Sequence, residues 1–137
     1  MNRMNLTVSA ISENELFVRT VISAFMLQLN PTVEQLNDVK TTVSEAVTNC
    51  IVHAYPNGQG EIKVECELGD DYIKIVISDN GIGIGNVEKA MQPFFTTKES
   101  EERSGLGFTI MKSFMDEFNV YSEENKGTIL TMKKKIA

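Results

Sequence analysis

Residues 73–85 read IKIVISDNGIGIG, and this stretch organises the rest of the chain. Isoleucine occupies every second position from 73 to 77, which predicts a strand with one buried face. The strand ends on Asp79, and the chain then passes through two closely spaced glycines, Gly81 and Gly83. Glycine adopts positive φ angles easily and lets a ligand approach the backbone closely. The stretch therefore predicts a strand that delivers one carboxylate to a turn where a ligand is held.

The composition is that of a single globular domain. The chain has 137 residues, 42% hydrophobic and 23% charged, and a chain of this length buries about two thirds of its unfolded surface. A net charge of −6 argues against a nucleic-acid partner. No apolar run is long enough to span a membrane, and no signal peptide is evident. We expect one cytoplasmic domain over residues 1–137, with no nucleic-acid or membrane contacts and with reduced cysteines.

A first helix is expected over residues 13–29. Ser12 and Glu15 form a capping-box pattern at its start. Glu15 and Arg19 are four residues apart, so they form either a solvated ion pair or part of a docking face for a partner. The expected apolar face consists of Leu16, Phe17, Ile22, Phe25, Met26 and Leu29.

A second, longer helix is expected to run to about residue 54. Thr32 and Gln35 form another capping box at its start. Glu45 and Asn49 are also four residues apart, so both side chains lie on the same side of this helix. The helix therefore carries a carboxylate and an amide one turn apart.

The remaining elements complete a two-layer arrangement. Strands are expected over residues 6–10, 61–68, 73–79, 119–122 and 128–134, and a last helix over 105–117. Residues 86–104 have no sustained apolar period, and a loop of this length inside a domain is typical of a functional lid. We expect an α/β (α+β) two-layer sandwich in which helices cover one face of a mixed, mostly antiparallel sheet.

Spacing excludes several other glycine-rich sites. A Rossmann fingerprint needs a glycine at position 86, which is Asn, and a β-α-β context. The chain contains no GxxxxGK[ST] phosphate loop. A calcium loop that starts at Asp79 needs an acidic twelfth residue, which is Ala90.

Four pieces of sequence do fit together. Glu45 and Asn49 lie on one helix, and Asp79 begins the glycine turn. Gly105-Leu106-Gly107 at a helix start offers free N–H groups to an anion such as phosphate. Gly127-Thr128 places a hydroxyl on a late strand.

These four pieces, in this order, closely resemble the ATP-binding boxes of the GHKL superfamily. The stretches SEAVTN (44–49), PFFTTK (93–98) and ERSGLGFTIM (102–111) resemble the anti-sigma serine kinases within it. The resemblance covers nearly the whole chain and implies a Bergerat-type ATP-binding fold with an ATP lid over about residues 85–104.

The resemblance also implies roles for individual residues. Asp79 would accept a hydrogen bond from the adenine amino group, and Asn49 would bind Mg²⁺ through its amide oxygen. Glu45 would act as the general base or order the water of the metal. The other implied nucleotide contacts are Gly81, Gly83, Thr96, Thr97, Lys98, Ser104, Gly105, Leu106, Gly107 and Thr128. The residues expected to bind partners are Glu15, Arg19 and Arg103.

The implied activity is that of an ATP-dependent protein-serine/threonine kinase that is also an anti-sigma factor. Its implied partners are the sporulation sigma factor sigma F, an anti-anti-sigma factor phosphorylated on serine, and a second copy of the chain. ATP, ADP and Mg²⁺ are the implied cofactors. A stress-response anti-sigma kinase, or a nucleotide-dependent module that sequesters sigma with little kinase activity, remains an alternative.

Other members of the superfamily fit less well. A histidine kinase needs an acceptor histidine on a dimerisation helix, but the single histidine, His53, lies on the helix of the nucleotide site. Gyrase-like ATPases need a transducer domain, and no residues are left for one. Two departures from the family pattern are Gly85, where proline is frequent, and Cys50, where alanine is frequent. We expect a looser lid hinge from the first and little consequence from the second.

Overall fold

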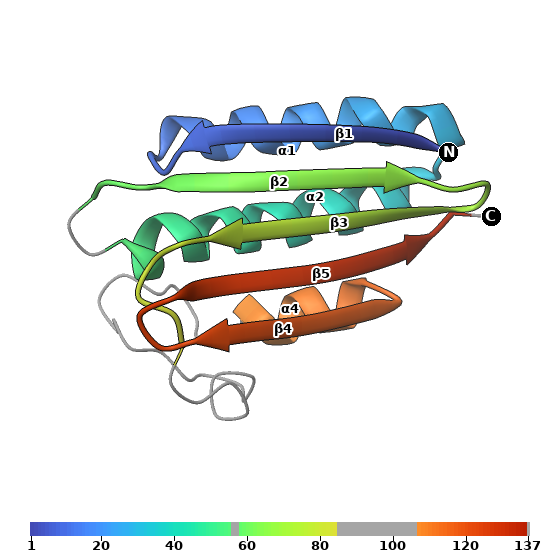
Figure 1. The fold of residues 1–137 in the computed structure, drawn as a ribbon. Helices are drawn as coiled ribbons and strands as arrows, with labels where there is room; N and C mark the ends of the chain where they lie inside the picture. Colours follow the sequence, from blue (N-terminus) through green and yellow to red (C-terminus); the bar gives the residue numbers. More distant parts are fainter. Residues whose placement is uncertain (56–57, 85–106, 137) are drawn as a thin grey trace.

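Alternating apolar residues build a five-stranded sheet, and helices cover one of its faces (Figure 1). The computed structural model describes residues 1–55, 58–84 and 107–136. The elements are β1 (Asn2–Ser9), α1 (Glu13–Met26), the 3-10 turn η1 (Leu27–Leu29), α2 (Val33–Asn49), the π-helical turn η2 (Cys50–Ala54), β2 (Glu61–Leu68), β3 (Tyr72–Asp79), α4 (Gly107–Phe114), β4 (Glu117–Glu123) and β5 (Gly127–Lys135).

The strand order is β1-β2-β3-β5-β4, so β3 lies at the centre of the sheet. Each of the four pairings is antiparallel, and the sheet formed by the described strands contains no parallel pair. The two-layer sandwich is thus confirmed, with a more regular sheet than the mixed one expected. The register places Asp79, the last residue of β3, opposite Thr128 of β5.

The core lies between the helix-covered face of the sheet and the three helices α1, α2 and α4 of the described chain. Ile73, Ile75 and Ile77 of β3 are all 0% exposed, as the sequence alternation predicted. Burying one such side chain contributes about 1.5–3 kcal/mol. Figure 1 shows the helices side by side behind the sheet, with both chain termini at the same end of the strands. No helix among the described residues is long and apolar enough to cross a membrane.

Helix α1 packs on the sheet through a face that agrees only in part with the expected one: Ile22 and Met26 are buried, and Phe25 and Leu29 pack against the core. Its buried residues are Val18, Ile22, Ser23 and Met26. Leu16 and Phe17 are 57% and 48% exposed, so their assignment to the inward face was wrong. The spacing of four between the buried positions turns these two side chains toward solvent. The start of α1 therefore carries an exposed apolar surface.

The two expected capping boxes have different outcomes. Thr32 accepts a hydrogen bond from Gln35 N at 3.1 Å and donates its own N–H to Gln35 Oε1 at 2.9 Å, so the second box is confirmed. Ser12 makes no side-chain cap, because its backbone is already helical (φ −55°, ψ −37°) and a capping residue needs an extended backbone. The first box is therefore wrong.

The bounds of β1 and α4 and the form of the end of the second helix also differ from the prediction. β1 begins at Asn2 because all eight of its residues pair with β2. α4 ends at Phe114 because Asp116 N donates to Lys133 O at 2.9 Å, which starts the pairing of β4. The last turn of the second helix, η2, is π-helical. π-Helical turns often occur at functional sites.

The caps provide a test of this description. Thr32→Ala removes a side-chain acceptor from the start of α2, and we expect it to lower the free energy of unfolding by about 0.5–2 kcal/mol. Ser12→Ala, at the exposed start of α1, is the matched control and is expected to change it by less than about 0.5 kcal/mol. Urea denaturation measures both variants. Equal losses would contradict the assignment of the two helix starts.

Candidate functional site

The end of β3 buries a carboxylate next to the second helix. The Asp79 side chain is polar yet only 8% exposed. Its Oδ1 accepts the Gly81 N–H at 2.9 Å, and its Oδ2 accepts the Cys50 S–H at 3.4 Å. Burial raises the pKa of Asp79, and the hydrogen bonds from Gly81, Cys50 and Thr128 oppose that rise. The site thus contains a buried acceptor whose orientation is held from two sides.

The glycine turn after Asp79 packs tightly against its neighbours. A Cβ atom at Gly81 would collide with the backbone carbonyl of Ala54, and one at Gly83 would collide with the carbonyl of Glu123. Gly83 also has a φ of +74°, which favours glycine. Both positions therefore require glycine because the turn itself is tightly packed. The sequence also predicted glycine here, but for the close approach of a ligand.

The π-helical turn η2 holds this glycine turn in place. Ala54 O accepts the Ile82 N–H at 2.9 Å. The Tyr55 hydroxyl accepts the Asn80 N–H at 2.8 Å and donates to Glu61 O at 2.6 Å. Together with the Cys50 thiol, these contacts fasten three of the four residues from Asp79 to Ile82 to the end of the helix. Sequence reasoning missed Cys50 and Tyr55, since neither lies in a motif that predicts a contact across the fold.

Thr128 lies opposite Asp79 and is joined to the same turn through Ser122. The two hydroxyl oxygens, Ser122 Oγ and Thr128 Oγ1, are 2.8 Å apart. Ser122 Oγ also accepts the Ile84 N–H at 2.7 Å and donates to Gly127 O at 2.9 Å. Ser122 is another residue that sequence reasoning missed. Its only signal is its register position opposite Thr128, which requires the strand pairing to be known.

The first residue of α4 lies against the acidic side of α2. A Cβ atom added to Gly107 would be 3.3 Å from Glu45 Oε2 and 3.7 Å from both Nδ2 and Oδ1 of Asn49. Glu45, Asn49 and Gly107, predicted as parts of one site, are therefore brought together. The N-terminus of a helix carries partial positive charge and favours an anion. This second cluster combines a carboxylate, an amide and a helix start.

The two clusters meet along one helix. Asn49 of the Gly107 cluster directly precedes Cys50, which contacts Asp79. Cys50 follows Glu45 by five positions, which corresponds to about 7.5 Å along a helix. Continuous helical backbone thus joins the part of the site around Asp79 to the part around Gly107.

Other expected site residues fall elsewhere. Glu15 and Arg19 lie on α1, joined at 3.8 Å, and Arg19 also donates to Ser44 Oγ at 3.4 Å. The expected lid (about 85–104) lies outside the described residues. So do the following expected site residues: Thr96, Thr97, Lys98, Arg103, Ser104, Gly105 and Leu106.

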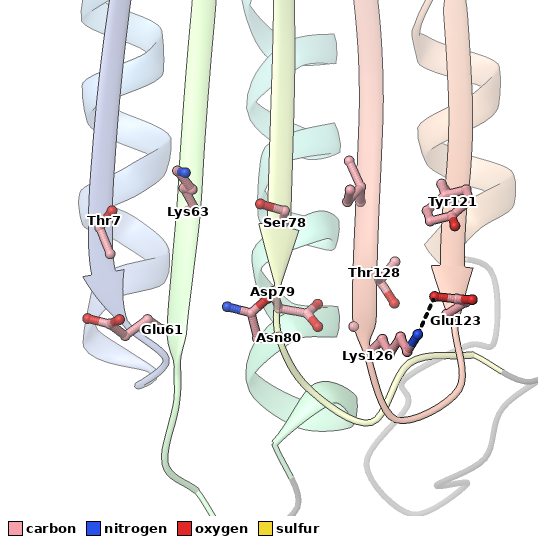
Figure 2. A pocket seen from close by; sticks show the side chains of 12 residues that line it. Thr7, Glu61, Lys63, Ser78, Asp79, Asn80, Tyr121, Glu123, Lys126 and Thr128 are labelled. Atoms are coloured by element: carbon pink, nitrogen blue, oxygen red, sulfur yellow. Dashed lines mark ion pairs between the residues drawn. The ribbon is translucent and has the colours of Figure 1, made fainter.

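A hollow of about 520 Å³, whose lining includes Asp79 and Thr128, lies where the strands end, largely on the uncovered face of the sheet. Figure 2 shows side chains from β1, β2, β3 and β4 around it, including Thr7, Lys63, Ser78 and Tyr121. Charges of both signs line the hollow, and Lys126 pairs with Glu123 at 3.6 Å. This mixture does not favour a polyanion, in contrast to the start of α4.

The donor atoms of the Gly107 cluster fit a magnesium ion that a phosphate ligand brings with it. Among the described residues no group of three or more His, Cys, Asp or Glu side chains could hold a metal ion. Mg²⁺ prefers hard oxygen ligands and often takes one or two from the protein and others from phosphates. Asn49, with its amide beside Glu45 and the helix start, suits this arrangement.

Comparison with known proteins identifies the family. The sequence pattern of the histidine kinase-like ATPase domain matches residues 10–134. The fold resembles the RsbU and RsbW domains of a Mycobacterium tuberculosis protein (TM-score 0.72, 16% identity, 99% of this chain and 33% of that one). It also resembles the catalytic domain of the histidine kinase ThkA (TM-score 0.62, 18% identity, 99% and 97%). The chain therefore belongs to the histidine kinase-like ATPase family.

Sequence similarity is more specific. The anti-sigma F factor of Clostridium perfringens (strain SM101 / Type A) is 52% identical over 136 residues, which cover 98% of this chain and 97% of that protein. The anti-sigma F factor of Caldanaerobacter subterraneus subsp. tengcongensis is 53% identical over 135 residues, covering 98% and 94%. Within the ATPase family, this chain belongs to the anti-sigma F factors.

The buried carboxylate predicts a pH dependence of stability. The folded-state pKa of Asp79 is raised, so the folded chain holds this proton more tightly than the unfolded chain does. We expect the free energy of unfolding, relative to Asp79→Asn, to rise as the pH falls from neutral toward about 4. Urea titrations at several pH values measure the difference. Asp70→Asn, on the exposed β2–β3 turn, controls for the loss of one negative charge, and a falling difference for Asp79 would contradict the burial argument.

Proposed function

We propose that the chain is an anti-sigma factor for the sporulation sigma factor sigma F, and a protein-serine kinase that uses Mg-ATP to phosphorylate an anti-anti-sigma factor. The observation that carries the kinase part is the approach of Gly107 to Glu45 and Asn49, one helical turn from the Cys50–Asp79 contact. The sigma-binding part is supported by relatives that bear the name anti-sigma F factor and are about half identical over nearly the full length.

Asp79 would recognise the adenine base. The carboxylate already accepts hydrogen bonds from Gly81, Cys50 and Thr128, and its two oxygens can accept about four in all. The remaining acceptor position can receive the amino group of adenine. Gly81 and Gly83 would shape the pocket through close backbone packing, and Thr128, hydrogen-bonded to Ser122, would support its floor.

Asn49 and the start of α4 would hold the phosphate end. The amide oxygen of Asn49 would bind Mg²⁺, whose chemistry when bound is to offset the negative charge of the phosphates. Backbone N–H groups at the start of α4 would face the same phosphates, because the first N–H groups of a helix lack intrahelical partners. Ser104, Gly105, Leu106, Thr96, Thr97 and Lys98 belong to this proposal by family resemblance alone.

Glu45 would act as the general base. The hydroxyl of the acceptor serine loses its proton to the Glu45 carboxylate as its oxygen forms a bond to the γ-phosphorus of ATP. The bond from that phosphorus to the β,γ-bridging oxygen breaks, and ADP leaves with the electron pair. Phosphoserine and ADP are the products. Glu45 Oε2 lies close to Gly107 at the start of α4, where the partial positive charge of the helix attracts a negative charge.

Partner binding would use the exposed side of α1. Leu16 and Phe17 present apolar surface there, and Arg19 lies one turn further along, half-buried against Ser44. Aromatic and arginine side chains are frequent at the energetic centres of interfaces. Arg103 and a homodimer complete the proposal by resemblance, as does a cytoplasmic location.

The alternative is a module that sequesters sigma in a nucleotide-dependent way with little kinase activity, or a kinase of the stress-response type. Sequestration needs no general base, whereas phosphoryl transfer does, so Glu45 distinguishes the two classes. Purified chain mixed with Mg-ATP and a candidate anti-anti-sigma factor, followed by mass spectrometric mapping of phosphoserine, tests the proposal directly. Absence of phosphoserine, with sigma F still bound, would favour the alternative.

Substitution of Glu45 tests the proposed general base. Glu45→Ala should reduce phosphorylation by about 10²–10⁴-fold, the usual contribution of a general base. Nucleotide binding should remain close to that of the unchanged chain, because the base contacts the acceptor serine rather than the nucleotide. A radiolabelled ATP assay and calorimetry measure the two effects. Glu34→Gln, at the exposed start of the same helix, is the matched control; unchanged phosphorylation by Glu45→Ala would remove the base assignment.

Substitution of Arg19 tests the proposed docking surface on α1. Arg19→Ala should weaken sigma F binding by about 5- to 30-fold, the range for an interface residue worth roughly 1–2 kcal/mol. Arg3→Ala is the control, since Arg3 makes a comparable ion pair with Glu67 at 3.5 Å on the other face of the molecule. Surface plasmon resonance with purified sigma F measures both. Similar losses for the two variants would contradict a docking surface on α1.

A further inference from the structure

The Cys50 thiol has an environment that sets it apart from the other cysteine of the chain. Both Cys50 and Cys66 are free, and each side chain is 3% exposed. Cys66 lies among apolar core residues, and burial alone raises its pKa to about 12. Cys50 instead places its sulfur 3.4 Å from Asp79 Oδ2. The two cysteines thus form a matched pair, one with a carboxylate neighbour and one without.

The contact has a defined direction. Burial, followed by the charge of Asp79 and the hydrogen bond to it, raises the pKa of the Cys50 thiol well above its ordinary value. In this hydrogen bond the Cys50 S–H donates and Asp79 accepts through Oδ2, because an ionised carboxylate has no proton to donate. Asp79 Oδ1 is held by the Gly81 N–H at 2.9 Å, so the two donors together set the plane of the carboxylate.

We propose that Cys50 is a positioning residue that orients the Asp79 carboxylate toward the amino group of the adenine base. The inference rests on the proposed function and deepens it, because it assigns base selection to a contact made by the π-helical turn. It departs from the expectation that cysteine at this position has little consequence.

A thiol is suited to this task because it is a weak donor. With the N–H groups of Gly81 and Thr128 it fills three of about four acceptor positions of the carboxylate and leaves one for a ligand, while it withdraws little electron density from the oxygen. Alanine at this position would supply no donor, and the carboxylate would be oriented by the N–H groups of Gly81 and Thr128, without a contact from the helical layer. The Ala54–Ile82 and Tyr55–Asn80 hydrogen bonds hold the following residues and do not contact the carboxylate.

The test compares two nucleotides that differ in one group. ADP carries the 6-amino group, and purine riboside 5′-diphosphate lacks it. We expect Cys50→Val, which keeps the volume without the donor, to weaken ADP binding by about 2- to 10-fold, the effect of one modest hydrogen bond. Binding of the 6-unsubstituted nucleotide should change by less than about 2-fold. Cys66→Val is the control and should leave both affinities unchanged, and Cys50→Ser, which restores a donor, should keep more of the ADP preference than Cys50→Val does.

A second measurement needs no nucleotide. In Cys66→Ala the remaining S–H stretching band belongs to Cys50, and in Cys50→Ala it belongs to Cys66. We expect the Cys50 band at lower frequency in the infrared spectrum, and we expect the additional change Asp79→Asn to move it upward, because a neutral amide is a weaker acceptor than a carboxylate. This spectrum also reports on the contact if a valine variant folds poorly.

The outcomes separate this inference from the proposed function. Equal weakening of the two nucleotides by Cys50→Val, equal impairment by serine and valine, or a Cys50 band that does not respond to Asp79→Asn would each overturn the positioning role alone. Failure of the unchanged chain to bind either nucleotide would overturn the proposed function, and the role in base selection with it.

Discussion

The burial of one carboxylate, Asp79, at the end of the central strand is the constraint on which the arrangement of the site depends. A buried charge is costly unless hydrogen bonds compensate it. Here the compensation comes from three directions: the turn that follows, through Gly81; the helical layer, through Cys50; and the neighbouring strand, through Thr128. These three contacts can form only when β3, β5 and the end of the second helix are all in place. The carboxylate therefore ties the geometry of a binding site to the completed fold.

The second helix carries this constraint across the molecule. Its inward residues Val39, Val43, Ala46 and Val47 are all 0% exposed, which keeps the helix from shifting on the sheet. The polar residues Glu45 and Asn49 occupy another side and meet Gly107, and the continuation into η2 meets Asp79. A five-residue π-helical turn widens the helix at that point. The second helix thus provides both a tightly packed apolar face and the polar face that carries Glu45 and Asn49.

Local rules explain which parts of the structure could be predicted from the sequence. The isoleucines of β3 and the Thr32 capping box depend on neighbours within a few residues, and both are confirmed. Ser12 carries the same box pattern, yet its backbone is helical and its side chain makes no cap, which the pattern alone does not indicate. Leu16 and Phe17 are apolar, but the phase of α1 is set by the deeper positions Val18 and Ile22.

The residues of the candidate site also fall into those that the sequence predicted and those that it did not. Glu45, Asn49, Asp79 and the glycine positions were predicted because motifs and family resemblance mark them. Cys50, Tyr55 and Ser122 were missed because their partners lie 29, 25 and 38 residues away in the chain. Such contacts follow from the register of β3, β5 and β4 and from the π-helical turn, neither of which a single sequence encodes in a readable pattern. Their roles emerge only when the hydrogen bonds of each buried polar atom are accounted for.

The two faces of the molecule differ in a way that supports a functional division between them. On the uncovered face of the sheet, charged side chains pair with one another: Arg3 with Glu67 at 3.5 Å, and Lys133 with Glu117 at 3.8 Å. Lys133 also lies over the Tyr72 ring at 4.2 Å from its centroid. Exposed pairs of this kind contribute little to stability, but they keep a broad sheet face hydrated.

The start of α1, by contrast, exposes Leu16 and Phe17 to solvent. Helices α1, α2 and α4 belong to one layer, in which α2 packs against both α1 and α4, so the proposed nucleotide site and the proposed docking surface share that layer. If the proposed function holds, a nucleotide at α2 and α4 and a protein partner at α1 would act on the same packed layer.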